Sequence, residues 1–261
     1  CAGNAELVGA ALNAGKHVLV EKPMTATLEE ADMIAGLAAS VKRTFMVGHQ
    51  YLYNDYIREL KQQLDRGVFG KIAYVFAEHF YPGPIRKDIG CFWETATHEL
   101  AMIDFLFSRP HLLNAQVKMV DIVQRGYDDF TQALLSFKNN LSVNIVTSWF
   151  TPQKVRRMII AGEKGMAVFD DQEPDHKLKL VLHPYPSDIG KPEFSPESFR
   201  ISGDDIIVPR VTPREPLRNQ LEHFIECIAS YASPLTDSTH GLWVTELLDA
   251  IYAEGKKGIA S

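Results

Sequence analysis

The sequence predicts an α/β fold in which a doubly wound, parallel sheet comes first and a strand-rich α+β region follows. Two short apolar segments near the start, 18–20 and 45–48, each come after a helical stretch, which is typical of buried parallel strands. Further along, strand patterns dominate from residue 72 to residue 182, and helical patterns return at the end of the chain.

The first elements follow from local signals. Residues 7–14 read as a helix that ends at Gly15, which leads into the strand 18–20. Thr27 and Glu30 have the spacing of a capping box and predict a helix over 27–40. A chain that opens in the middle of an α/β unit leaves a parallel strand uncovered, so we expect an upstream piece to be missing.

We expect a domain boundary near residue 50, with domains over 1–50 and 51–261. A helix over 54–64 leaves the first domain, and the final helices could pack back on it. The remaining expected elements are strands over 72–80, 117–123, 133–137, 142–149, 158–161, 167–170 and 178–182, helices over 92–107, 216–231 and 241–254, and a surface loop over 184–216.

Alternation along 142–149 predicts a sheet with one buried face. Val143, Ile145 and Trp149 lie on that face and need a cover, which helices or a second subunit could provide. The pattern therefore suggests that copies of the chain associate, with cover by helices of the same chain as the alternative.

Composition excludes several classes of protein. The net charge is −6 and no basic run exceeds a pair, which argues against nucleic-acid binding. No segment has the apolar length of a membrane span, and no signal peptide is visible. Cys1, Cys91 and Cys227 are too few and too scattered for a disulfide framework or a metal site, so we expect no metal and a reduced, cytoplasmic setting.

Lys22 is the first candidate for chemistry. It follows Glu21 at the carboxyl end of a predicted buried strand, where open α/β sheets present ligand groups, and Pro23 fixes the backbone after it. Such a lysine can donate or accept a proton if desolvation lowers its pKa. The alternative is a surface salt bridge between Glu21 and Lys22.

His98 is the second candidate. Glu94 lies four residues earlier on the same helix face, so its carboxylate can orient or charge the imidazole. The alternative is a packed histidine, with Glu94 at a helix N-terminus. Hydrolase or lyase chemistry by this pair lacks a nucleophile or metal motif.

Other candidates are weaker. Arg86 and Lys87 lie in the loop before that helix and could bind a phosphate or carboxylate, or could simply be solvated. Tyr51 and Asn54 could line a sugar site, although aromatic residues at a domain junction are more often core. We assign no role to the histidines at 79, 111, 176, 183, 223 and 240. The chain contains no Gly-x-Gly-x-x-Gly or Walker loop.

Taken together, these residues resemble the Gfo/Idh/MocA family, the relatives of glucose-fructose oxidoreductase and inositol dehydrogenase. The matching features are Ala14 to Pro23, Val47 to His49 and the helix with His98. The resemblance implies a partial Rossmann domain that binds NAD or NADP, followed by an α+β domain with a large open, mainly antiparallel sheet that often serves oligomerisation, here in a homodimer or homotetramer.

The resemblance also implies roles. Lys22 would transfer the proton and His98 would touch the oxidised hydroxyl. Glu21, Lys22, Pro23 and His49 would bind the cofactor, and Tyr51, Asn54, Arg86, Glu94 and His98 the substrate. The family usually has Asp where this chain has Glu94. A glycine-rich phosphate loop and a ribose-binding acidic residue would precede Cys1.

The implied activity is hydride transfer between a nicotinamide cofactor and a hydroxyl of a sugar, nucleotide sugar or polyol. A weaker subgroup resemblance, which includes Gly83 to Arg86 and Trp93-Glu94, points to enzymes that oxidise the 3-hydroxyl of UDP-N-acetyl sugars or their uronates, with Arg86 facing an anionic part of the substrate. The alternative is a non-catalytic or truncated relative that acts as a sugar-binding or oligomerisation module.

Overall fold

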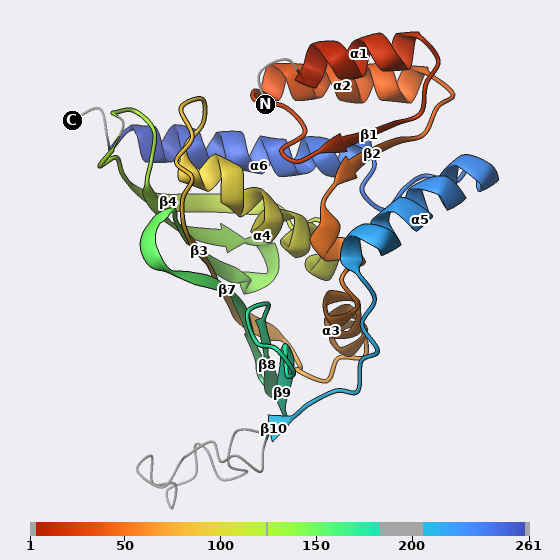
Figure 1. The fold of residues 1–261 in the computed structure, drawn as a ribbon. Coiled ribbons are helices and arrows are strands. Elements are labelled where there is room, and N and C mark those ends of the chain that lie inside the picture. Colours follow the sequence, from red (N-terminus) through yellow and green to blue (C-terminus); the bar gives the residue numbers. More distant parts are fainter. Residues whose placement is uncertain (1–3, 124, 183–205, 259–261) are drawn as a thin grey trace, which may run out of the picture.

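The computed structural model describes residues 4–123, 125–182 and 206–258. In these residues a two-stranded parallel sheet and an eight-stranded, mostly antiparallel sheet are connected through helices (Figure 1). This arrangement confirms the predicted mixed α/β fold. None of the helices in the described ranges is long and apolar enough to cross a bilayer.

The small sheet pairs β1 (Val18–Glu21) with β2 (Phe45–Gly48) in parallel, and Glu21 lies opposite Gly48. Helices α1 (Asn4–Asn13) and α2 (Leu28–Ser40) pack together beside it (Figure 1). Gly15 ends the first helical segment in the left-handed region at φ 70°, as its position predicted. The Thr27 side chain caps α2 by accepting the N–H of Glu30.

The large sheet has the strand order β10-β9-β8-β7-β3-β6-β5-β4, in which β3 and β6 form the one parallel pair of neighbours between described strands. Its strands are β3 (Ile72–Pro82), β4 (Leu112–Val120), β5 (Phe130–Phe137), β6 (Ser142–Ser148), β7 (Phe150–Gly162), β8 (Gly165–Asp170), β9 (Leu178–Leu182) and β10 (Ile206–Ile207). A single turn of 3₁₀ helix, η2 (Lys138–Asn140), joins β5 to β6.

Helix α4 (Cys91–Phe107) lies against one face of this sheet and contacts β3, β5 and β6. The Asp128 carboxylate accepts the N–H of Phe92 at 2.8 Å and so holds the first turn of α4. Val143, Ile145 and Trp149 are buried within the chain. Helices of the same chain therefore provide the cover that their pattern required.

The remaining helices connect the two sheets. The 3₁₀ turn η1 (Gln50–Tyr53) and α3 (Asp55–Asp65) lead from β2 to β3, and α5 (Pro216–Ser230) packs beside η1. The long α6 (Ser238–Lys256) runs past α2, α4 and β4 (Figure 1). The parallel strands and the α4 side of the large sheet are thereby brought together.

Several element predictions were wrong in their bounds, most of all the strand expected over 158–161, which is β7 and already begins at Phe150. The strand expected over 117–123 is β4, which begins at Leu112 and ends at Val120, because the Asp129 carboxylate accepts the N–H groups of Ile122 and Val123 and turns the chain there. The loop expected over 184–216 contains the short strand β10, and its part at 184–205 lies outside the described residues.

Candidate active site

Lys22 leaves the end of β1 and reaches α4. Its ammonium group donates to the Glu94 carboxylate at 3.0 Å and to the Glu94 backbone oxygen at 2.9 Å. Both side chains are about four-fifths buried. These two bonds hold Lys22 against the helix and use two of the three N–H groups of its ammonium. The third N–H remains to meet a ligand.

Arg86 comes from the loop before α4 and binds the other oxygen of Glu94 at 3.1 Å. Its guanidinium also forms a two-point fork on Asp88, with bonds of 2.9 and 2.7 Å. The fork on Asp88 is the main cause of the raised pKa of Arg86, and the same bond lowers the pKa of Asp88 to about 2. Glu94 thus lies between two cations.

His98 follows Glu94 by one helical turn and is buried between two rings. The ring of His79, from β3, stacks on it at 5.7 Å between centroids, and the edge of Tyr51 meets it at 5.1 Å. Burial, and then the charge of Lys22, holds the pKa of His98 well below its usual value. His98 is therefore a neutral imidazole at neutral pH.

A chain of buried hydrogen bonds lies behind Lys22. The two imidazoles of His49 and His240 meet at 3.0 Å, and the other ring nitrogen of His240 bonds to the Asp104 carboxylate. All three side chains are buried. Burial lowers the pKa of His49 well below its usual value, and the nearby charges of His240 and Lys22 lower it further.

The order of this chain places one proton. Because the Asp104 carboxylate only accepts, His240 carries a proton on Nδ1.

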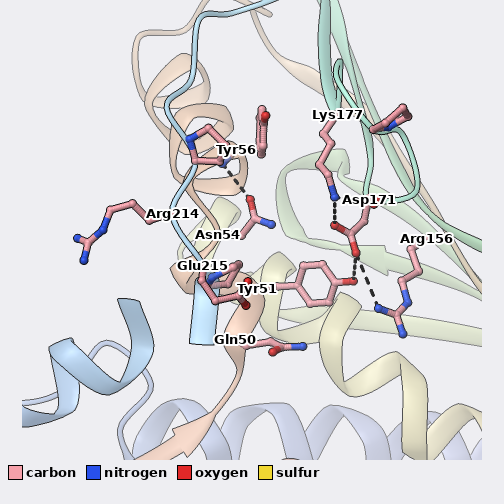
Figure 2. A pocket seen from close by; sticks show the side chains of 12 residues that line it. Gln50, Tyr51, Asn54, Tyr56, Arg156, Asp171, Lys177, Arg214 and Glu215 are labelled. Atoms are coloured by element: carbon pink, nitrogen blue, oxygen red, sulfur yellow. Dashed lines mark hydrogen bonds and ion pairs between the residues drawn. The ribbon is translucent and has the colours of Figure 1, made fainter. Parts of the chain in front are cut away.

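Two neighbouring hollows surround these groups. The first, of about 380 Å³, is lined by side chains from β1, β3, α4, β7 and the loop before α4, among them Lys22, Arg86, Glu94, His98 and Arg156. The second, of about 330 Å³, includes Tyr51, Asp171 and Lys177 (Figure 2). Arg156 lines both hollows.

The structure brings together most of the residues that the sequence singled out. Lys22, Arg86, Glu94 and His98 share the first hollow, whereas Tyr51 and Asn54 line the second. The side-chain oxygen of Asn54, Oδ1, caps α3 by accepting the N–H of Tyr56 at 2.9 Å (Figure 2). Pro23 is buried after a cis peptide bond, and Glu21 stays exposed at the strand end, beside the strand end that carries His49.

Sequence reasoning missed His79, Arg156, Asp104 and His240. A signal for His79 was present, because it continues the buried alternation of Val75 and Ala77, and a polar residue on an inward-facing position indicates a site. Arg156 lies directly opposite His79 on β7. No local pattern joins Asp104 to His240, which are 136 residues apart and meet only through the packing of α6 on α4.

Two sequence-family models match the chain. The oxidoreductase family with an NAD-binding Rossmann fold, GFO/IDH/MocA, matches residues 3–49, and the GFO/IDH/MocA C-terminal domain matches residues 57–168. Together the two matches span more than half of the chain.

Individual relatives agree with these matches. UDP-N-acetylglucosamine 3-dehydrogenase of Acidithiobacillus ferrooxidans is 26% identical over 88% of this chain and 68% of its own length. A cyclohexadiene dehydrogenase of Comamonas testosteroni, 1-carboxy-3-chloro-3,4-dihydroxycyclo hexa-1,5-diene dehydrogenase, is 28% identical over 54% of this chain. The chain spans only 38% of that relative and about half of two oxidoreductases of Escherichia coli.

A solved structure shows the same fold. The WlbA dehydrogenase from Bordetella pertussis, in complex with NADH and UDP-GlcNAcA, aligns with a TM-score of 0.75 over 98% of this chain and 74% of its own, at 20% identity.

Proposed function

Because this chain belongs to the Gfo/Idh/MocA oxidoreductase family, we propose that it moves a hydride between a nicotinamide cofactor, NAD or NADP, and a hydroxyl of a sugar, nucleotide sugar or polyol. One observation carries the proposal. Lys22, Glu94 and His98 share one hollow at the carboxyl end of a parallel strand, where sheets of this kind bind their ligands.

The residues at the ends of β1 and β2 fit one end of such a cofactor. The Glu21 carboxylate makes no hydrogen bond with any residue of the described ranges and can accept one from a ligand. A Cβ atom at position 48 would lie 3.2 Å from that carboxylate, so the glycine at this position leaves space for the Glu21 side chain. Glu21, Lys22, Pro23 and His49 would hold the cofactor there, and its nicotinamide ring supplies the hydride chemistry when it is bound.

Lys22 and His98 then handle the proton. The neutral imidazole of His98 is the group ready to accept the hydroxyl proton during oxidation. The Lys22 ammonium, held by Glu94, donates a hydrogen bond to the substrate oxygen and stabilises the negative charge that develops there, and in the reverse direction the protonated His98 returns the proton. Glu94 orients Lys22, and Tyr51 keeps His98 in place by packing on its ring.

The test is the formation of reduced nicotinamide from NAD or NADP with a panel of sugars and polyols. Lys22→Met should lower turnover by about 10²- to 10⁴-fold while circular dichroism shows an unchanged fold. Lys16→Met, at an exposed position on the same stretch of chain, is the matched control and should retain activity. Near-normal turnover by Lys22→Met would contradict the proposed role.

The outer face of the large sheet favours a second role in assembly. Tyr74 on β3 and Leu134 on β5 are 47% and 39% exposed, and both point away from the face that α4 covers. We propose that this face joins copies of the chain into a homodimer or homotetramer. Sedimentation of Tyr74→Lys should then show a smaller particle than the unchanged chain. An oligomerisation module without catalysis would show assembly but no hydride transfer.

We also propose domains over 1–50 and 51–261 and a cytoplasmic location. The buried thiols of Cys91 and Cys227, both free, are compatible with a reducing compartment. Thiol titration of the unfolded chain, compared before and after reduction, tests the redox state.

A further inference from the structure

Arg156 lies at the junction of the two hollows. It is on β7, directly opposite His79 on β3, and its strand position faces the same side as Met158 and Ile160, which are buried. Figure 2 shows its guanidinium beside the bond between Tyr51 and Asp171. The position puts a cation within the space where a substrate would extend away from Lys22 and His98.

The other lysine and arginine side chains that line the two hollows each make a hydrogen bond to a carboxylate. Lys22 is bound to Glu94, and Arg86 is bound to Asp88 and Glu94. Lys177 donates to the Asp171 carboxylate and to its backbone oxygen at 2.9 and 2.7 Å. Each of these cations already has a carboxylate as a partner.

Arg156 differs from them in its hydrogen bonds. Its nearest carboxylate is Asp171 at 3.8 Å, which is beyond hydrogen-bond distance. Its Nε is buried without any partner among the described residues. Buried donors of this kind are rare in folded proteins, since each lost hydrogen bond has a cost.

Asp171 has hydrogen-bond donors other than Arg156. Its carboxylate accepts from Lys177 at 2.9 Å and from the Tyr51 hydroxyl at 3.1 Å. The guanidinium forms a long ion pair with Asp171 without a hydrogen bond, so it can donate hydrogen bonds to a ligand while Asp171 keeps its own. The planar fork of an arginine matches a carboxylate or a phosphate with two parallel hydrogen bonds.

We propose that Arg156 is the anion-binding group of this site and that the substrate carries a carboxylate or phosphate beside its reacting sugar. Arg86, which the sequence suggested for this task, instead holds Glu94 and Asp88 in place. The inference rests on the proposed function for the presence of a sugar in the first hollow, but the binding of the acidic group stands on Arg156 alone.

Calorimetric titration of the whole chain at low salt tests this inference, with D-glucuronate, D-glucose 6-phosphate and D-glucose as probes. The unchanged chain should bind at least one acid more tightly than glucose, and which acid is preferred separates a carboxylate from a phosphate. Arg156→Gln should weaken the binding of that acid by about 10- to 100-fold and leave the binding of glucose unaffected. Arg156→Lys should be intermediate because it keeps the charge without the fork.

Arg157→Gln is the matched control, because Arg157 follows on the same strand but pairs with Glu78 on the opposite face. It should keep the preference for the acid. The inference is overturned if the unchanged chain shows no preference, including no binding of any probe, or if Arg156→Gln retains the preference. Failure of the proposed function looks different: acid binding would depend on Arg156, but no sugar would reduce the nicotinamide.

Discussion

The Lys22 ammonium and the Glu94 carboxylate lie 3.0 Å apart although 72 residues separate them in the chain. One group comes from the end of the parallel sheet and the other from α4, which covers the large sheet. Since Glu94 also binds Arg86, its carboxylate organises the polar side of the first hollow.

Glu94→Gln should therefore disturb the site while leaving the fold intact. The amide keeps the shape of the side chain but no longer neutralises Lys22 and Arg86, and its single oxygen replaces the two that these cations now share. We expect kcat to fall by about 10- to 100-fold and its pH profile to shift. Glu59→Gln on α3, outside both hollows, should change neither.

Asp104→Asn should destabilise the protein. Burial raises the pKa of Asp104, but the bonds and charges of His240 and Arg109 outweigh it and leave the pKa below its ordinary value. Removing the charge from this buried chain should lower the free energy of unfolding by about 2 kcal/mol, measured by urea denaturation. Asp65→Asn, whose partner Lys61 is on the surface of α3, should cost less than about 0.5 kcal/mol.

A nitrogen NMR spectrum of the histidines would show whether Asp104 also sets the tautomers. In the unchanged chain His240 should carry its proton on Nδ1. If both Asp104→Asn and the unchanged chain show the same stability and the same tautomers, the buried chain of hydrogen bonds has no such role.

Stability should fall as the pH drops below about 6.5. Burial keeps His49 and His98 neutral in the folded chain, while the unfolded chain binds protons at both with the ordinary pKa of 6.5. The contribution of these two groups to the free energy of unfolding is fully present above that pH. Below it, the contribution falls by about 1.4 kcal/mol per pH unit for each group. His223, whose pKa burial also lowers, adds a smaller effect of the same sign.

Denaturation from about pH 7.5 to about pH 5 measures this slope. His98→Gln should remove part of it, whereas His111→Gln, at an exposed position, should leave it unchanged. An equal slope for His98→Gln and the unchanged chain would mean that His98 binds protons equally well in the folded and unfolded states.

Gly90→Ala should destabilise the N-terminus of α4. The new Cβ would lie 1.7 Å from the Asp128 carboxylate, which holds the first turn of the helix that carries Glu94 and His98. We expect a loss of about 1–3 kcal/mol in the free energy of unfolding. Gly36→Ala, at an open helical position in α2, should instead raise stability by about 0.5–1 kcal/mol. Equal effects at the two glycines would contradict the close contact.

The sequence predicted the elements whose signals are local. Gly15 and Thr27 marked a helix end and a helix start, and both act as expected. The bounds of β4 were wrong because a side chain nine residues beyond its end, Asp129, turns the backbone. That bond could not be predicted from periodicity, since it depends on where β5 places the carboxylate.

The candidate site was predicted only where a local pattern carries the chemistry. Lys22 could be found from its place at a strand end and His98 from its spacing to Glu94 on a helix, and the structure puts them in one hollow. Arg156 is next to Arg157, which lies on the outer face, so the inward position of Arg156 became clear only with the register of β3 and β7. His240 had no signal at all, because its partners lie on other elements.

The position of β3 in the large sheet has a consequence for how the chain folds. Its two neighbours, β6 and β7, follow it by some sixty residues or more, so β3 completes its hydrogen bonds only when both distant strands have been brought back to it. Closing such long loops before any contact forms makes folding slow. His79 and Arg156 meet at that same pairing, so the binding pocket depends on long-range strand pairing rather than on any local segment of the chain.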